Sequence, residues 1–292
     1  MTIIVGFSAS RQGGAPVYLA AQLARNTGEN VVAAAVLDRV LPPGSDPFED
    51  EYRQHIARRA LKGLEQLAER MRNDTDISVL VHESRSVPTG LLELVERYDA
   101  SMVVVGSSSS GLLGRVALGS VTEALVHTAA VPVAIAPRGY PQTPLPLERL
   151  TAAYGGSADA VGLLRMTAEL AKSWSVEMRI AAFTVRPPAM FAGSIEPSAE
   201  TLVIREWYAS AVQGACDEIA AARTTVAVDN VDIVVGAGVE WRDAVDGIAW
   251  APGDLLLLGS GAAGVRAQVF LGSAASRILR HAPVPVIIMP RT

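Results

Sequence analysis

Short apolar runs alternate with amphipathic stretches along the chain. In the first half, five runs have the length and β-branched character of buried strands: 3–7, 30–36, 77–82, 101–106 and 131–136. Between them, apolar positions recur at helical spacing over 14–26, 51–72, 89–98 and 119–129. The second half has matching runs at 149–154, 177–184, 231–236, 254–259 and 284–289, and a long amphipathic stretch at 199–223. Alternating strands and helices predict an α/β fold with a parallel sheet covered on both faces.

The two halves repeat one another. Residues 131–138 read Val-Pro-Val-Ala-Ile-Ala-Pro-Arg, and residues 284–291, at an offset of 153, read Val-Pro-Val-Ile-Ile-Met-Pro-Arg. We therefore expect one domain used twice, over 1–138 and 149–292. The segment 139–148 holds three prolines and is predicted to be a short, stiff linker. The fold class is then two tandem Rossmann-like, doubly wound parallel sheets with five main strands each and helices on both faces.

Composition and charge narrow the function. The chain has 292 residues, half of them apolar, a formal net charge of -5 and one cysteine. Such a chain is not disordered, and it forms neither an internal disulfide nor a multi-cysteine metal site. Its four histidines lack the spacing of a zinc motif, so we expect no metal. No Lys/Arg-rich run or membrane-length apolar run occurs, so neither nucleic acid nor a membrane is an expected partner. The N-terminus begins like a strand, without a basic leader, so we expect a cytoplasmic protein.

Ligands of such sheets bind beyond the carboxyl ends of the strands, so two glycine-rich loops that follow strands are candidate ligand-binding loops. One runs from Gly106 to Ser120 and the other from Gly259 to Ser273, with equal spacing between the first glycine and the Gly-Ser pair. Glycines let backbone approach a phosphate, and a helix N-terminus offers free N–H groups. The alternative is that Gly-Ser only begins a helix and the glycines only shape a turn. Arg115 and Arg266 are either cations for a phosphate or solvated loop arginines. No complete P-loop or G-x-G-x-x-G motif is present.

The order of elements resembles a known family. A Gly/Ser loop, a Gly-Ser pair and the segments His127–Val133 and His281–Val286, both ending in Val-Pro-Val, are similar to the universal stress protein family in its tandem form. Nucleotide-binding members have the loop pattern G-x2-G-x9-G-(S/T) and an Asp after the first strand. This chain departs from that pattern in both halves. Its residues at the second glycine are Ser109 and Ala262, and those at the Asp position are Ser8 and Gly155.

The resemblance implies two sets of candidate nucleotide-binding residues. Those of the first half are Ser8, Val36, Gly106, Ser109, Gly119 and Ser120. Those of the second half are Gly155, Val185, Gly259, Gly272 and Ser273. ATP is the candidate cofactor. No catalytic residue is assigned, because no general base is recognisable in the loops.

Two functions remain open. The first is a regulatory or scaffolding module of the stress response, which has degenerate nucleotide loops and acts through an unknown protein partner. The alternative is an ATP/ADP-binding sensor, with or without slow hydrolysis, that binds through the first domain. The strands at 131–136 and 284–289 resemble those with which the family pairs domains edge to edge, so they are predicted to pair antiparallel and to form a pseudo-dimer within the chain. The sequence leaves a homodimer open.

Overall fold

The structure is a computed structural model that describes most of the chain. The described residues are 1–8, 13–38, 47–71, 75–143, 145–154, 158–185, 231–259, 261–262, 269–270 and 273–290, with single residues and short pieces between 206 and 220. The helix expected over 199–223 lies mostly outside the described residues and stays a prediction.

Each half supplies five strands to the main sheet. Those of the first half are β1 (Thr2–Gly6), β2 (Asn30–Asp38), β3 (Ile77–Ser84), β4 (Ala100–Gly106) and β5 (Val133–Ala136). Those of the second half are β6 (Arg149–Tyr154), β7 (Glu177–Val185), β8 (Asp232–Gly238), β9 (Asp254–Gly259) and β12 (Val286–Met289). A separate short hairpin consists of β10 (Gly261–Ala262) and β11 (Val269–Phe270). The strands expected at 131 and 284 begin two residues later, after Pro132 and Pro285, because proline has no N–H for the ladder.

The helices lie between the strands. Those of the first half are α1 (Ala15–Thr27), α2 (Pro47–Met71), α3 (Val87–Arg97) and α4 (Ser120–Thr128). Those of the second half are α5 (Ala158–Trp174), α7 (Trp241–Asp246) and α8 (Ser273–His281). Local signals set several helix ends. Gly28 ends α1 with a φ of 70°, a conformation that glycine adopts without strain, and the Ser86 hydroxyl accepts from the Thr89 N–H at the start of α3.

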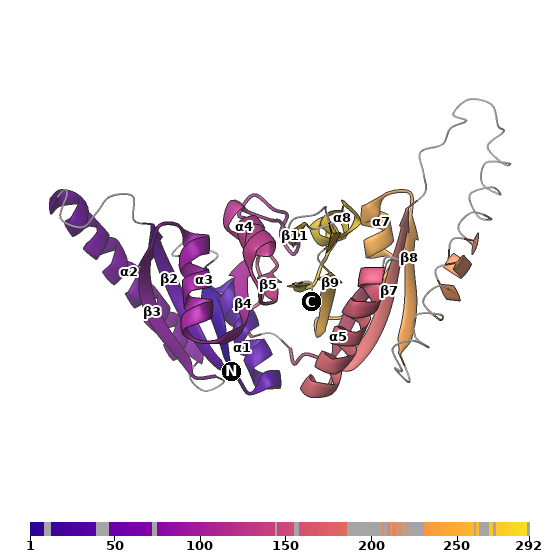
Figure 1. Cartoon of the computed structure of the whole chain (residues 1–292), viewed down its shortest axis with the longest axis horizontal. Coiled ribbons are helices and arrows are strands. Elements are labelled where there is room, and N and C mark those ends of the chain that lie inside the picture. Colours follow the sequence, from indigo (N-terminus) through magenta and orange to yellow (C-terminus); the bar gives the residue numbers. More distant parts are fainter. Residues whose placement is uncertain are drawn as a thin grey trace, which may run out of the picture.

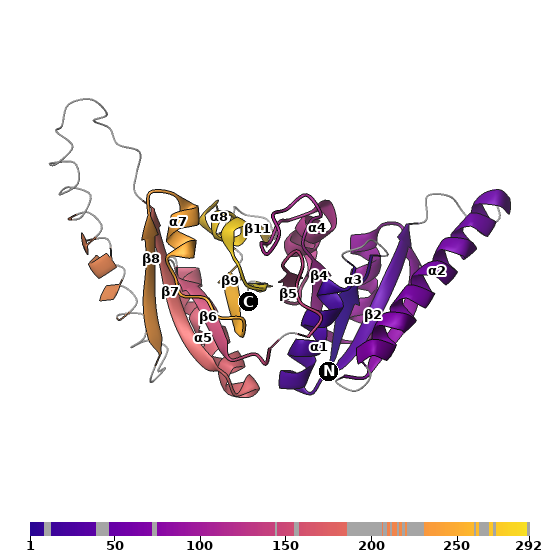
Figure 2. The same ribbon diagram turned by 180° about the vertical axis from the view of Figure 1, so that it is seen from behind.

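All ten main strands form one continuous sheet. Its order is β3-β2-β1-β4-β5-β12-β9-β6-β7-β8, so the two five-stranded halves meet at β5 and β12 in the middle of Figures 1 and 2. Every strand pair is parallel except β5 and β12, where Val286 lies opposite Ile135 and Ile288 opposite Val133. The predicted antiparallel pairing of the last strands is therefore confirmed. It covers the edge strand of each half with the other.

Helices cover both faces of this sheet. One core cluster takes the apolar sides of α1, α2 and α5, and a second takes those of α3, α4, α7 and α8. Leu255–Leu258 of β9 is buried throughout, as expected for a central strand with both faces covered. No helix among the described residues is both long and apolar enough to cross a membrane.

The Pro-rich segment between the halves is fastened to α1. Gln22, only 1% exposed, donates from its side-chain amide to the Leu145 carbonyl at 2.6 Å and accepts a hydrogen bond from the Tyr140 hydroxyl. Leu147 is buried in the core cluster beside α1. The segment is thus held by a buried polar side chain as well as by the restricted backbone of its prolines. The division into 1–138, 139–148 and 149–292 stays a prediction.

Candidate functional site

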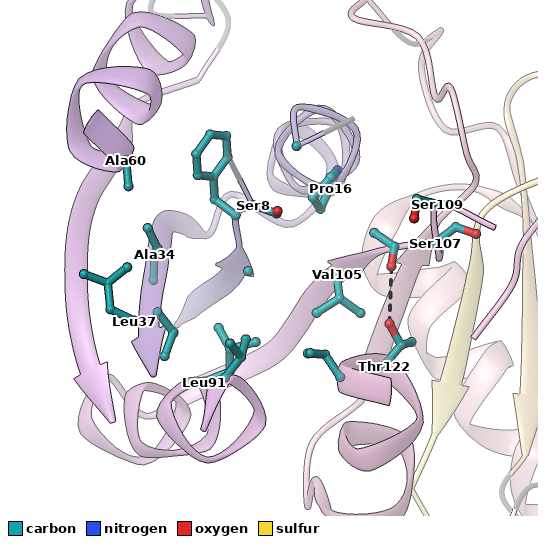
Figure 3. A pocket seen from close by; sticks show the side chains of 18 of the residues that line it. Ser8, Pro16, Ala34, Leu37, Ala60, Leu91, Val105, Ser107, Ser109 and Thr122 are labelled. Carbon is teal, nitrogen blue, oxygen red and sulfur yellow. Dashed lines mark hydrogen bonds between the residues drawn. The ribbon is translucent and has the colours of Figure 1, made fainter. Parts of the chain in front are cut away.

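A cavity of about 470 Å³ opens in the first half at the carboxyl ends of β1, β2 and β4. This is where the strand order reverses, with β1 lying between β2 and β4. Four of the six first-half candidates line it: Ser8, Val36, Gly106 and Ser109. They come from segments about 100 residues apart in the sequence, and Figure 3 shows the lining side chains together.

The walls of this cavity are largely apolar. Leu91 of α3, Val105 of β4 and Ala60 of α2 contribute to them, and the polar side chains are the hydroxyls of Ser8, Ser107, Ser109 and Thr122. No charged side chain is among the described residues that line the cavity. Such a surface suits a flat ring with a few hydrogen-bonding groups.

The glycine loop after β4 is shaped by its own hydrogen bonds. The Ser107 hydroxyl accepts from the Ala117 N–H at 2.7 Å, and the Ser108 N–H donates to the Ala117 carbonyl at 2.8 Å. Gly114 has a φ of 74°, and a Cβ on Gly111 would lie 2.6 Å from the Ala117 side chain. These glycines are therefore needed by the turn itself. The Ser107 hydroxyl is engaged within the loop.

Gly119 and Ser120 do not line the cavity. Gly119 precedes α4 in an extended conformation, and Ser120 is exposed as the first residue of that helix. The next turn of α4 faces the cavity through Thr122, whose hydroxyl donates to the Gly106 carbonyl at 3.3 Å (Figure 3). The role of Gly119 and Ser120 as nucleotide-binding residues stays a prediction. Thr122 was missed, although the helical period after Gly-Ser could have indicated it.

Arg115 binds the other half of the chain. Its guanidinium donates to the Asp246 carboxylate at 2.8 Å and to the backbone carbonyl of His281 at the end of α8. The cation therefore joins the glycine loop of the first half to α7 and α8 of the second. In this arrangement it is neither a solvated loop arginine nor a phosphate ligand. Arg266 lies outside the described residues.

Comparison with known proteins decides the family. The sequence model of the Universal stress protein family matches residues 1–137 and again residues 146–290. The chain belongs to the universal stress protein family. Universal stress protein Rv2319c of Mycobacterium tuberculosis is 33% identical over 99% of this chain and 100% of its own length, and Universal stress protein Mb2346c of Mycobacterium bovis gives the same values.

Solved structures of the family share the fold. A universal stress protein from Archaeoglobus fulgidus superposes with a TM-score of 0.59 at 17% identity and covers 99% of this chain and 96% of that one. This universal stress protein is therefore an α/β protein with a mostly parallel sheet, in tandem form, as the repeat predicted.

The family loop is altered in this universal stress protein without closing the cavity. Ser109 stands at the position of the second loop glycine, and its side chain is exposed while still lining the cavity. Ser8 stands at the Asp position at the end of β1 and also lines the cavity. Both substitutions leave a neutral hydroxyl where a nucleotide-binding member has a glycine or a carboxylate.

The second-half candidates are only partly described. Gly155 and Gly272 lie outside the described residues, and Gly259 and Ser273 end β9 and begin α8. Val185 lines a different cavity, together with Trp241 and residues of α8. The described residues of the second half therefore do not repeat the first-half cavity. Among the described residues, no three His, Cys, Asp or Glu side chains gather as metal ligands would.

Proposed function

We propose that this tandem universal stress protein is a regulatory module of the stress response that binds an adenine nucleotide in its first half. The observation that supports this proposal is the 470 Å³ cavity, in which Ser8, Val36, Gly106 and Ser109 meet at the switch in strand order. Its volume lies within the ~300–1,000 Å³ of small-molecule sites.

The walls suggest how the ligand would lie. The adenine ring would pack against the apolar side chains of Val36 and Leu91, with the ribose near Ser8. The phosphates would lie toward Ser109 and the glycine loop, near the first turn of α4, where N–H groups and the helix dipole favour negative charge.

The neutral lining predicts modest affinity. A carboxylate accepts charge-assisted hydrogen bonds from hydroxyl or amine groups, which are worth roughly 1.5–3 kcal/mol, whereas Ser8 offers a neutral bond. A difference of ~2 kcal/mol corresponds to ~30-fold in the dissociation constant. We therefore expect Ser8→Asp to strengthen nucleotide binding by about this factor.

Calorimetric titration with ATP and ADP tests the proposal. Ser109→Phe would place a ring at the mouth of the cavity and is expected to abolish binding. Ser110→Phe is the matched control, because Ser110 is also exposed but does not line the cavity. If neither the unaltered protein nor Ser8→Asp binds at millimolar nucleotide, the proposal is wrong. The regulatory role would then be independent of nucleotide.

A further inference from the structure

A second cavity, of about 430 Å³, lies in the other half of the molecule. It is enclosed by the end of β7 at Val185, by the loop into α7 at Val239 and Glu240, and by one face of α8. The first-half cavity shares none of its lining residues. The two cavities are therefore separate.

Positive charge dominates the lining of this second cavity. Arg242 lines it from α7, and Arg277 and Arg280 line it from α8, whereas Glu240 is the one acidic residue among the described lining. Arg277 and Arg280 are three positions apart, so they share one face of the helix, where two like charges repel each other. Helix α8 keeps both of them on the side that faces the cavity.

The two α8 arginines form no ion pair with the described acidic residues. Arg242 pairs with Asp246 at 3.6 Å, but neither Arg277 nor Arg280 forms an ion pair with any part of the chain that the structure describes. The Arg277 guanidinium lies 5.9 Å from the ring centre of Trp241, which is half-buried in the cavity wall. Two guanidinium groups, whose fork of N–H donors matches phosphate oxygens, are thus available at one cavity.

His281 adds a polar group at the same place. Burial and the nearby cations Arg115, Arg242 and Arg280 lower its pKa, so its ring is neutral near pH 7 and can donate one hydrogen bond. Trp241, Val185 and the exposed Val239 add apolar surface to the lining. The cavity therefore combines cationic and apolar groups, with Arg277 lying over the Trp241 ring.

The first half has no arginines at the positions that correspond to Arg277 and Arg280. At the offset of 153, Arg277 corresponds to Ala124, Arg280 to His127 and His281 to Thr128 of α4. The repeat thus preserves the helix and changes the residues that face this cavity. A structural role shared by both halves would not require arginines here.

We propose that the second cavity is a separate ligand site that binds a small phosphomonoester, with its phosphate between Arg277 and Arg280 and its apolar or aromatic body against Trp241. The site goes beyond the proposed nucleotide cavity and does not depend on it. A doubly charged phosphate suits the paired guanidinium groups, and the volume admits a body of about one ring beside it.

Phenyl phosphate is the probe, because it has the proposed phosphate and one ring. A ligand ring against Trp241 should change tryptophan fluorescence saturably on titration. Two charge-assisted contacts are lost in the double variant Arg277→Ala/Arg280→Ala, and we expect at least a ~30-fold weaker response. Arg97→Ala is the matched control, because Arg97 likewise lies over an aromatic ring, that of Tyr98, but in the first half. It should bind as the unaltered protein does.

Three results would overturn the site. The first is the absence of a saturable fluorescence response, and the second is equal affinity in the double variant. The third is binding of succinate as tight as that of phenyl phosphate. Succinate is a dicarboxylate of equal charge, so its equal affinity would show that the site does not recognise phosphate. The α8 arginines are exposed, so the variants should fold, and an unchanged melting temperature checks this. Ser109→Phe, which blocks the first-half cavity, should leave phenyl phosphate binding intact and so separates this site from the nucleotide proposal.

Discussion

Removing the Asp254 carboxylate should destabilise the second half severely. Asp254 begins β9 and is 2% exposed. Its oxygens accept two hydrogen bonds from Arg149, at 2.9 and 2.8 Å, one from Arg179 at 3.2 Å and one from the Ala251 N–H at 2.9 Å. Asp254→Ala would leave two guanidinium groups and a backbone donor without this acceptor.

Most of the lost free energy of unfolding should come from leaving the buried Arg179 charge without its carboxylate partner. The Arg149 side chain is 23% exposed and can turn to water, whereas that of Arg179 is 2% exposed. Burial already lowers the pKa of Arg179, because desolvation disfavours its charged form. The Ala249 carbonyl at 2.8 Å and the Trp250 ring at 5.0 Å would remain as partners, but neither has a negative charge. Breaking a buried ion pair by removing one partner costs ~3–5 kcal/mol.

Denaturant unfolding followed by tryptophan fluorescence measures this cost, since all four tryptophans lie beyond the midpoint of the chain. Ser101→Ala is the matched control at the corresponding position of β4. The Ser101 hydroxyl donates to the Glu29 carboxylate and lies 3.3 Å from the Thr2 carbonyl, and its loss should cost only ~1–2 kcal/mol. A loss below ~1 kcal/mol for Asp254→Ala would refute the reasoning, because an uncompensated Arg179 charge must cost more than that.

Three further changes test other contacts. Arg115→Ala and Asp246→Ala should each lower the free energy of unfolding by ~1 kcal/mol, and the double variant by less than the sum, because the two side chains form a partly exposed ion pair that joins the halves. Full additivity in a double-mutant cycle would show that the two do not interact. Tyr140→Phe should cost ~1–2 kcal/mol by leaving the buried Gln22 oxygen unpaired. In the unaltered protein, burial raises the pKa of Tyr140 from 10.0 to about 12, so this hydroxyl ionises at a lower pH in the unfolded state than in the folded one. The free energy of unfolding should therefore decrease above pH 10. A free energy of unfolding that stays constant above pH 10 would contradict this. The pKa of His281 is lower in the folded protein than in the unfolded chain, so the unfolded state takes up this proton first as the pH falls. Stability should therefore decrease as the pH drops below 6.5. His281→Gln should remove that part of the pH dependence in thermal melts.

The sequence by itself determined the elements and the repeat. Apolar runs and helical spacing located all ten main strands and the first-half helices to within a few residues, apart from the start of α2. The Val-Pro-Val repeat predicted one domain used twice. Those features follow from local patterns, because burial on both faces of a strand or one face of a helix leaves a period in the sequence. The resemblance to the family, rather than these patterns, indicated Ser8, Val36, Gly106 and Ser109, which line the first-half cavity.

Only the tertiary structure decided which polar side chains meet. Arg149, Arg179 and Asp254 are separated by up to 105 positions and come together because their strands β6, β7 and β9 are neighbours, with the three residues near the strand starts. Arg115 was a candidate phosphate ligand by its loop and turned out to join the two halves. A charged side chain has no periodicity of its own, so its partner depends on the packing of elements far apart in the chain.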